Sequence, residues 1–167
     1  MPGMAADPTI FEYLKFPEEF EIFWLSWKMP EKNESLQDYA VRMCEEINQP
    51  EPVLIGVSFG GVLVQEMSKV IKTKKVIIIS SVKSHHELPP RMKFARNTGI
   101  YKYLPTGFLD YIYQIERLPV GNFIKKRIQL YKTYLSVNDK DYLDWSIKNL
   151  VCWQQENPPE NLIHIHG

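Results

Sequence analysis

The residue with the clearest chemical potential in this chain is Ser58, which stands in the pattern Gly-Val-Ser-Phe-Gly at residues 56–60. Where G-x-S-x-G joins a strand to a helix, the tight turn holds the serine in a strained backbone conformation and exposes its hydroxyl group. Gly56 and Gly60 leave room for the close approach of strand and helix. The pattern predicts a nucleophile near a helix N-terminus, where free amides and the helix dipole favour an anion. The alternative is a serine that only caps the helix.

The segments on either side of Ser58 favour the nucleophile. Residues 52–58 and 76–80 are short apolar runs, typical of strands that are buried on both faces of a parallel sheet. Residues 61–75, between these runs, have the length of a crossover helix in a right-handed βαβ unit. Ser58 is therefore predicted to lie at a junction between a strand and a helix of an α/β fold.

Three further elements are predicted before this unit. A short helical stretch is expected around residues 8–13. Residues 20–27 are dense in aromatic and β-branched side chains, which predicts a strand. Residues 35–49 predict an amphipathic helix that is capped by Ser35 and turns its apolar stripe toward a core.

The pattern changes after residue 83. Residues 84–157 contain no apolar run typical of a buried strand. Four stretches with helical spacing are instead separated by prolines and glycines, namely residues 91–99, 107–118, 122–135 and 140–154. Residues 161–167 then predict one more strand. We divide the chain into a core part at residues 1–83, a helical insertion at residues 84–157 and a late core strand at residues 158–167.

Four features together resemble the α/β-hydrolase superfamily: the opening MPGMAADP, the GVSFGG stretch around Ser58, the helical insertion after VIIISS, and the final HIHG. The resemblance spans nearly the whole chain. It implies a three-layer α/β/α sandwich with a mostly parallel sheet, covered by the insertion as a helical cap. It also implies that the backbone amides of Met4 and Phe59 form an oxyanion hole, with Pro2 standing where many members have histidine.

The same resemblance implies a carboxylesterase-like serine hydrolase that acts on an ester, thioester or amide through an acyl-enzyme on Ser58. The implied substrate is a small acyl compound, and no cofactor is implied. Members of the superfamily place a strand before the position that matches Pro2, and the catalytic acid and histidine after the position that matches Gly167. We therefore expect an incomplete core here, truncated at both ends. Two alternatives remain open: a non-catalytic binding or scaffold domain, and an acyltransferase that uses the same elbow.

The histidines are the other residues that could do chemistry. His85, His86 and Glu87 follow the second predicted strand, where Glu87 could orient a base, but a solvated loop is the preferred interpretation. His164 and His166 alternate along the last predicted strand, a spacing that could hold a metal ion. Because no third ligand stands at a recognisable spacing, no metal site is predicted.

Composition limits the remaining classes of function. The chain has 167 residues, 44% of them apolar, which suits one domain with a buried core. Its 20 basic and 20 acidic residues balance, so nothing favours nucleic-acid binding. Since neither a membrane-spanning run nor a secretory leader is recognised, we expect a soluble cytoplasmic protein with Cys44 and Cys152 as reduced core thiols. The oligomeric state is left open.

Overall fold

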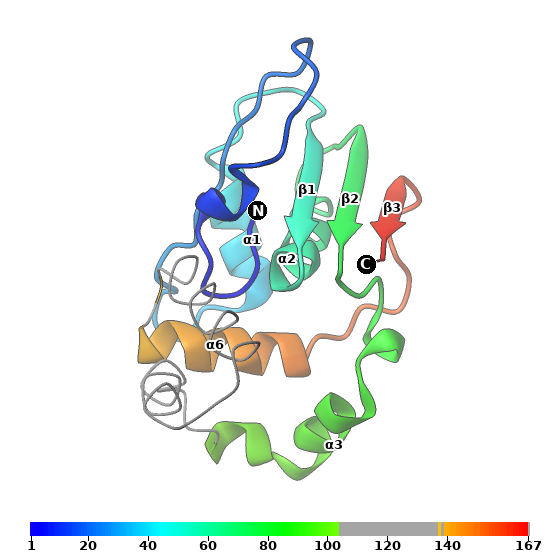
Figure 1. The fold of residues 1–167 in the computed structure, drawn as a ribbon. Coiled ribbons are helices and arrows are strands. Elements are labelled where there is room, and N and C mark those ends of the chain that lie inside the picture. The colour runs from blue at the N-terminus through cyan, green and yellow to red at the C-terminus, as the bar shows by residue number, and fades with distance from the viewer. Residues whose placement is uncertain (104–136, 138, 167) are drawn as a thin grey trace, which may run out of the picture.

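The computed structural model, which describes residues 1–103, 137 and 139–166, contains a parallel sheet (Figure 1). The strands β1 (Val53–Val57), β2 (Lys75–Ile79) and β3 (Leu162–Ile165) lie in the order β1-β2-β3. Both pairs are parallel, with Val57 opposite Ile79 and Ile79 opposite Ile165. The general α/β class and the three strands predicted at residues 52–58, 76–80 and 161–167 are confirmed.

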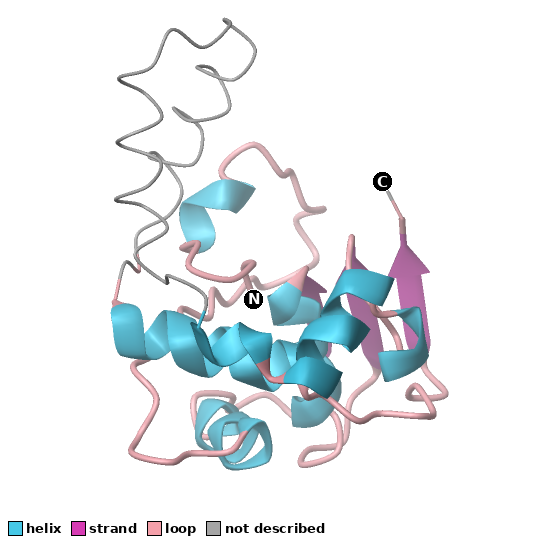
Figure 2. Cartoon of the chain, turned by 90° about the horizontal axis from the view of Figure 1, so that it is seen from below, coloured by secondary structure: helices cyan, strands magenta, loops and turns pink. Residues whose placement is uncertain are grey.

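Two helices stack beside this sheet. Helix α2 (Phe59–Met67) begins directly after Ser58, packs on β1 and β2, and is buried along its whole length. Helix α1 (Leu36–Cys44) packs in turn on α2. The Asp38 amide donates to Ser35 Oγ at 3.1 Å, which confirms the predicted cap. Seen from below, the helices gather beside the strands, which lie at one side of the molecule (Figure 2).

Five further helical elements are described, and the longest of them is α6. The 3-10 helix η1 (Pro8–Phe11) confirms the helical stretch predicted near the start. In the insertion, the described elements are η2 (His85–Glu87), α3 (Pro90–Thr98), η3 (Ile100–Tyr103) and α6 (Lys140–Val151). Helices α3 and α6 contact each other. The helical stretches predicted at residues 107–118 and 122–135 lie outside the described residues.

Residues 20–27 form no strand, so that prediction is wrong. A strand needs backbone partners, and none of the described strands pairs with this segment. Side-chain packing holds the segment instead. The Trp24 ring stacks on Phe11 with 5.3 Å between centroids, and the Trp27 ring stacks on Phe59 at 5.1 Å. The aromatic residues that suggested a strand therefore anchor an irregular segment to the core.

The two faces of the sheet differ in burial. Leu54, Val76 and Ile78 are buried on the face that Gly56 turns toward α2. On the opposite face, Ile55, Val57, Ile77 and Ile79 are only half-buried. The expectation that these strands are buried on both faces is therefore wrong for the described part of the chain.

An aromatic cluster ties the N-terminal residues to the start of α2. Its rings pack within 4.6 to 6.4 Å of one another between centroids and belong to Trp27, Tyr39, Phe59, Tyr142 and Trp145. The Trp27 indole donates to the Gly3 carbonyl at 2.7 Å, and the Ala5 amide donates to the Tyr142 hydroxyl at 3.2 Å. The cluster thus fixes the segment that the resemblance assigns to the oxyanion hole.

The two cysteines are free thiols in different surroundings. Cys44 is buried in the core, and its burial raises the pKa of the thiol to about 11. Cys152 is half-buried beside the Tyr101 hydroxyl. Among the described helices, none has both the length and the apolar character needed to cross a lipid bilayer.

In a polypeptide that begins at Met1, the free amine of this residue makes stability depend on pH. Met1 continues the sheet beside β1, since its amine donates to the Ile55 carbonyl at 2.7 Å and its carbonyl accepts from the Val57 amide at 3.1 Å. Burial lowers the pKa of this amine from 8.0 to about 5. Between these values the unfolded chain binds a proton that the folded chain does not, so the free energy of unfolding rises with pH. The expected rise is on the order of a few kcal/mol.

Urea unfolding at pH steps between about 5 and 8 measures this dependence. The control is protein acetylated at the Met1 amine, which keeps one N–H for Ile55 and no longer titrates. Its unfolding free energy should change less with pH over the same window. An equal or steeper dependence in the acetylated protein would show that other groups cause the effect.

Candidate active site

The backbone of Ser58 occupies a strained turn between β1 and α2. Its φ of 52° and ψ of −119° lie outside the regions that non-glycine residues favour. The Ser58 amide donates to the Ile79 carbonyl at 2.9 Å. The Ser58 carbonyl accepts from the Gly61 amide at 2.9 Å and from Ser81 Oγ at 2.7 Å. These three hydrogen bonds fix the turn that the G-x-S-x-G pattern predicts.

The hydroxyl of Ser58 makes no hydrogen bond to any of the described residues. Ser58 precedes the first residue of α2, yet its side chain accepts no hydrogen bond from the helix amides. The residue is exposed, and no partner for its hydroxyl is found among the described residues. The alternative in which Ser58 only caps the helix is therefore not observed.

The glycines of the pattern allow contacts that a side chain would block. A Cβ atom on Gly56 would lie 2.3 Å from the Gly60 carbonyl oxygen, where strand and helix cross. A Cβ atom on Gly60 would lie 2.2 Å from the Pro2 carbonyl oxygen, where the N-terminal segment passes. Gly56 and Gly60 thus permit the close approach predicted for them, and Gly60 also admits a third segment that was not predicted.

The Phe59 amide follows Ser58 directly, and Gly3, the residue before Met4, lies beside Ser58, since a Cβ on Gly3 would be 3.6 Å from Ser58 Cβ. The Gly3 carbonyl is held by the Trp27 indole at 2.7 Å and by the Ala6 amide at 3.1 Å. Because a trans peptide turns its N–H opposite to its carbonyl, the Met4 N–H points away from Trp27. The Phe59 N–H is the first amide of α2 and so lacks an intrahelical acceptor. Neither amide has a hydrogen-bond acceptor in the described part of the chain.

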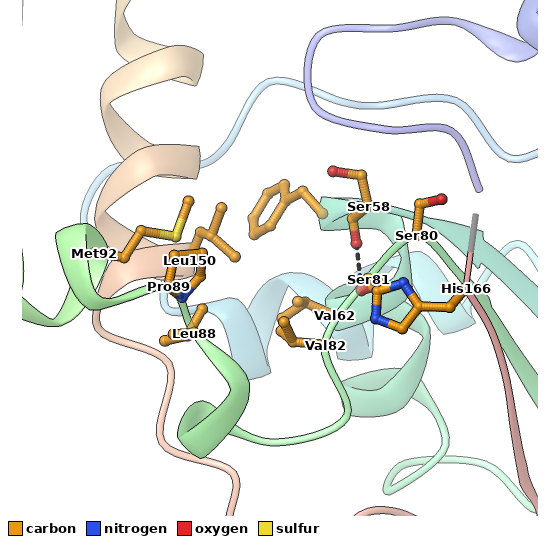
Figure 3. Close-up of a pocket in the computed structure, with 11 residues that line it drawn as sticks. Ser58, Val62, Ser80, Ser81, Val82, Leu88, Pro89, Met92, Leu150 and His166 are labelled. Carbon is orange, nitrogen blue, oxygen red and sulfur yellow. Dashed lines mark hydrogen bonds between the residues drawn. The ribbon is translucent and has the colours of Figure 1, made fainter.

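Ser58 opens onto a pocket of about 250 Å³. Figure 3 shows Ser58, Ser80, Ser81 and His166 on one side of this pocket, and an apolar group on the other. The labelled apolar residues of that group are Leu88, Pro89, Met92 and Leu150, while Val62 and Val82 lie between the two sides. The pocket therefore has a polar side that includes Ser58 and an apolar side formed by the insertion.

The sequence did not single out Ser80 or Ser81 as site residues, and it suggested His166 only as a possible metal ligand. Ser80 and Ser81 follow β2, and His166 follows β3, so all three lie at the same sheet edge as Ser58. The signal was available, because the carboxyl ends of parallel strands meet at one edge and ligands bind there. Ser80 also has a positive φ of 47°, which sequence alone does not reveal.

The side chains of His85 and Glu87 make contacts with residues other than Ser58. His85 Nδ1 lies 2.8 Å from the Gln155 carbonyl oxygen. The Glu87 carboxylate accepts from the Lys83 amide at 2.9 Å and pairs with the Lys83 ammonium at 3.3 Å. These contacts agree with a solvated loop rather than with an orienting acid beside Ser58.

The histidines of the last strand lie near each other. The rings of His164 and His166 are 4.8 Å apart, and His164 Nε2 lies 3.1 Å from the Ser81 carbonyl oxygen. Among the described residues, no three His, Cys, Asp or Glu side chains come together as ligands for a metal ion. His164 therefore contacts the loop that carries Ser81.

Comparisons with known proteins add no family to this geometry, because no family model matches the chain and no curated protein shows significant similarity to it. What the site can do follows from its own residues. It presents a serine hydroxyl without a partner among the described residues, the amide of Phe59 next to it in sequence, and a pocket with a polar and an apolar side.

We expect Ser58→Gly to stabilise the fold relative to Ser58→Ala. Both changes remove the hydroxyl, but only glycine adopts positive φ without strain. Relief of strain of about 1 to 3 kcal/mol, partly offset by the greater chain entropy of glycine, predicts a net gain of roughly 1 kcal/mol. Urea unfolding of both variants measures the difference. Equal stabilities would mean that the turn is not strained.

We expect Gly60→Ala to be strongly destabilising, by about 3 kcal/mol, because its Cβ would clash with backbone atoms of the N-terminal segment. Gly3→Ala is the matched control, since a Cβ there would lie at an ordinary 3.6 Å from Ser58 Cβ. Its unfolding free energy should stay within about 1 kcal/mol of the unchanged protein. Similar losses in both variants would contradict the close contact at Gly60.

Proposed function

We propose that this protein is a serine hydrolase of the α/β-hydrolase type, in which Ser58 attacks the carbonyl carbon of an ester, thioester or amide. The observation that carries the proposal is the conformation of Ser58. Its backbone is strained and fixed by three hydrogen bonds, while its hydroxyl faces a pocket without a partner among the described residues. Strain of this kind persists where the surrounding structure determines it, and it is concentrated at functional sites.

The amides of Phe59 and Met4 are the proposed oxyanion donors. When Ser58 Oγ attacks, the carbonyl oxygen becomes negatively charged and needs donors that are already in place. The Phe59 amide belongs to the first turn of α2, whose dipole adds a favourable potential for an anion. The Met4 amide is held through the Gly3 carbonyl and Trp27. Each such donor is worth about 3 kcal/mol of transition-state stabilisation.

The reaction proceeds through an acyl-enzyme on Ser58. A general base takes the hydroxyl proton, the leaving group departs with a proton, and water then cleaves the acyl-enzyme. Of the described histidines, His166 lines the pocket, but no hydrogen bond joins it to Ser58. The proposal therefore assigns the base to none of the described residues.

The arrangement of elements supports the proposed fold type. Ser58 follows a strand inside a parallel sheet and begins the helix that packs on that sheet. The insertion supplies Met92 of α3 and Leu150 of α6 to the pocket, as a helical cap would. The three-layer sandwich and the cap remain part of this proposal.

A fluorophosphonate probe tests the nucleophile. The complete protein, including any residues that its gene encodes beyond Gly167, is treated with the probe, and the modified peptide is identified by mass spectrometry. We expect one adduct on Ser58 and none in Ser58→Ala. Ser68→Ala is the matched control, because Ser68 lies at the other end of α2 and bonds to the Gln65 carbonyl. It should be labelled like the unchanged protein.

Two results would contradict the hydrolase. Equal labelling of the unchanged protein and Ser58→Ala would place the reactive group elsewhere. Absence of labelling in the folded protein, checked by circular dichroism, would favour the non-catalytic binding domain instead.

A further inference from the structure

The apolar side of the pocket is formed by several elements of the insertion. Leu88 and Pro89 precede α3, Met92 lies in its first turns, and Leu150 lies near the end of α6. Figure 3 shows these side chains grouped across the pocket from Ser80 and His166. Leu88 is 2% exposed, so this wall continues into the interior. A substrate attacked by Ser58 would therefore place one of its substituents against the apolar side of the pocket.

We propose that this apolar side binds the acyl chain of the substrate, and that the substrates are esters of uncharged acids of about four to seven carbons. The inference rests on the proposed hydrolase function. It adds the chemical class and the length of the acyl group, neither of which the G-x-S-x-G pattern contains.

The charge of the acyl group follows from the residues that line the pocket. No Asp, Glu, Lys or Arg is among the described residues that form it. Two lysines near the start of the insertion have other partners: the Lys83 ammonium pairs with Glu87, and the Lys93 ammonium donates to the His86 carbonyl at 2.7 Å. A carboxylate on the acyl chain would lose water without gaining a counter-charge, and burial of an unpaired charge is strongly unfavourable.

The length of the acyl group follows from the volume. A liquid-like heavy atom such as a water oxygen takes about 30 Å³, so the whole pocket of about 250 Å³, its polar side included, holds about eight heavy atoms. The carbonyl carbon and oxygen beside Ser58 take about two of these places, which leaves about six for the carbons of the chain. Each methylene group that enters the apolar side contributes about 0.8 kcal/mol, which corresponds to nearly fourfold in affinity. Affinity should therefore rise with chain length until the apolar side is full.

Binding to Ser58→Ala tests this assignment without turnover. Methyl esters of acetic, butanoic, hexanoic, octanoic and decanoic acid are titrated into protein with 13C-labelled methionine methyl groups. The Met92 signal is assigned with Met92→Leu. We expect this signal to shift, with affinity rising about threefold to fourfold per added methylene up to hexanoate. Decanoate should bind no more tightly than octanoate, and monomethyl succinate should bind at least tenfold more weakly than methyl hexanoate.

A bulkier side chain at position 92 tests the location. Met92 is half-buried and lines the pocket, so Met92→Trp in the Ser58→Ala background should weaken methyl hexanoate binding at least tenfold. Phe94→Trp is the matched control. Phe94 lies on the same helix, two residues further on, and is 62% exposed. It should change the affinity by less than twofold.

Each other result has a definite meaning. Equal affinities for acetate and hexanoate esters, equal binding of monomethyl succinate, or equal effects of the two tryptophan variants would overturn the acyl pocket. Hexanoate binding at Met92 without fluorophosphonate labelling of Ser58 would retain the pocket and overturn the hydrolase. The two proposals therefore fail in distinguishable ways.

Discussion

The contact between the N-terminal segment, the turn at Ser58 and the start of α2 is the constraint on which the site depends. Three backbones meet there, because a Cβ on Gly60 would lie 2.2 Å from the Pro2 carbonyl and a Cβ on Gly56 would lie 2.3 Å from the Gly60 carbonyl. Only glycine permits both approaches. Ser58 projects from this crossing because the strand must turn into the helix within one residue. The strain is thus a consequence of how closely strand and helix pack.

The aromatic cluster stabilises this crossing from the opposite side. Phe59 follows Ser58 in sequence, is 1% exposed and stacks on Trp27, whose indole holds the Gly3 carbonyl. One side chain therefore connects the first turn of α2 to the segment that carries the Met4 amide. Burial of large rings contributes strongly to stability, and it can compensate for a strained turn of a few kcal/mol. In this way the core determines the relative positions of the two proposed oxyanion donors.

Much of this arrangement could be predicted from local sequence, and the exceptions have physical causes. The cap at Ser35 depends on a residue three positions away, and the G-x-S-x-G pattern spans five residues, so local sequence indicates both features. The hydrogen bonds that join Ser58 to Ile79 and Ser81 are long-range, and the pattern does not contain them. Residues 20–27 carry strand-like composition, but a strand also needs a partner, which composition cannot supply. Likewise, the place of His166 at the pocket depends on β3 pairing with β2 across more than eighty residues. Such pairing is set by the tertiary fold.

The order of the strands also explains why two serines, Ser58 and Ser80, have strained backbones at the carboxyl end of the sheet. The amide of Ser58 donates to Ile79 of β2, and the amide of Ser80 donates to Ile165 of β3, each at 2.9 Å. Each neighbouring strand thus anchors the serine that ends the strand before it, and both serines have positive φ. A non-glycine residue keeps such a conformation only where its surroundings determine it. Strand β3, which contributes no nucleophile, therefore positions Ser80 directly, and it acts on Ser58 through β2. Strand β3 is therefore part of the site, even though the proposed chemistry depends on Ser58, which follows β1.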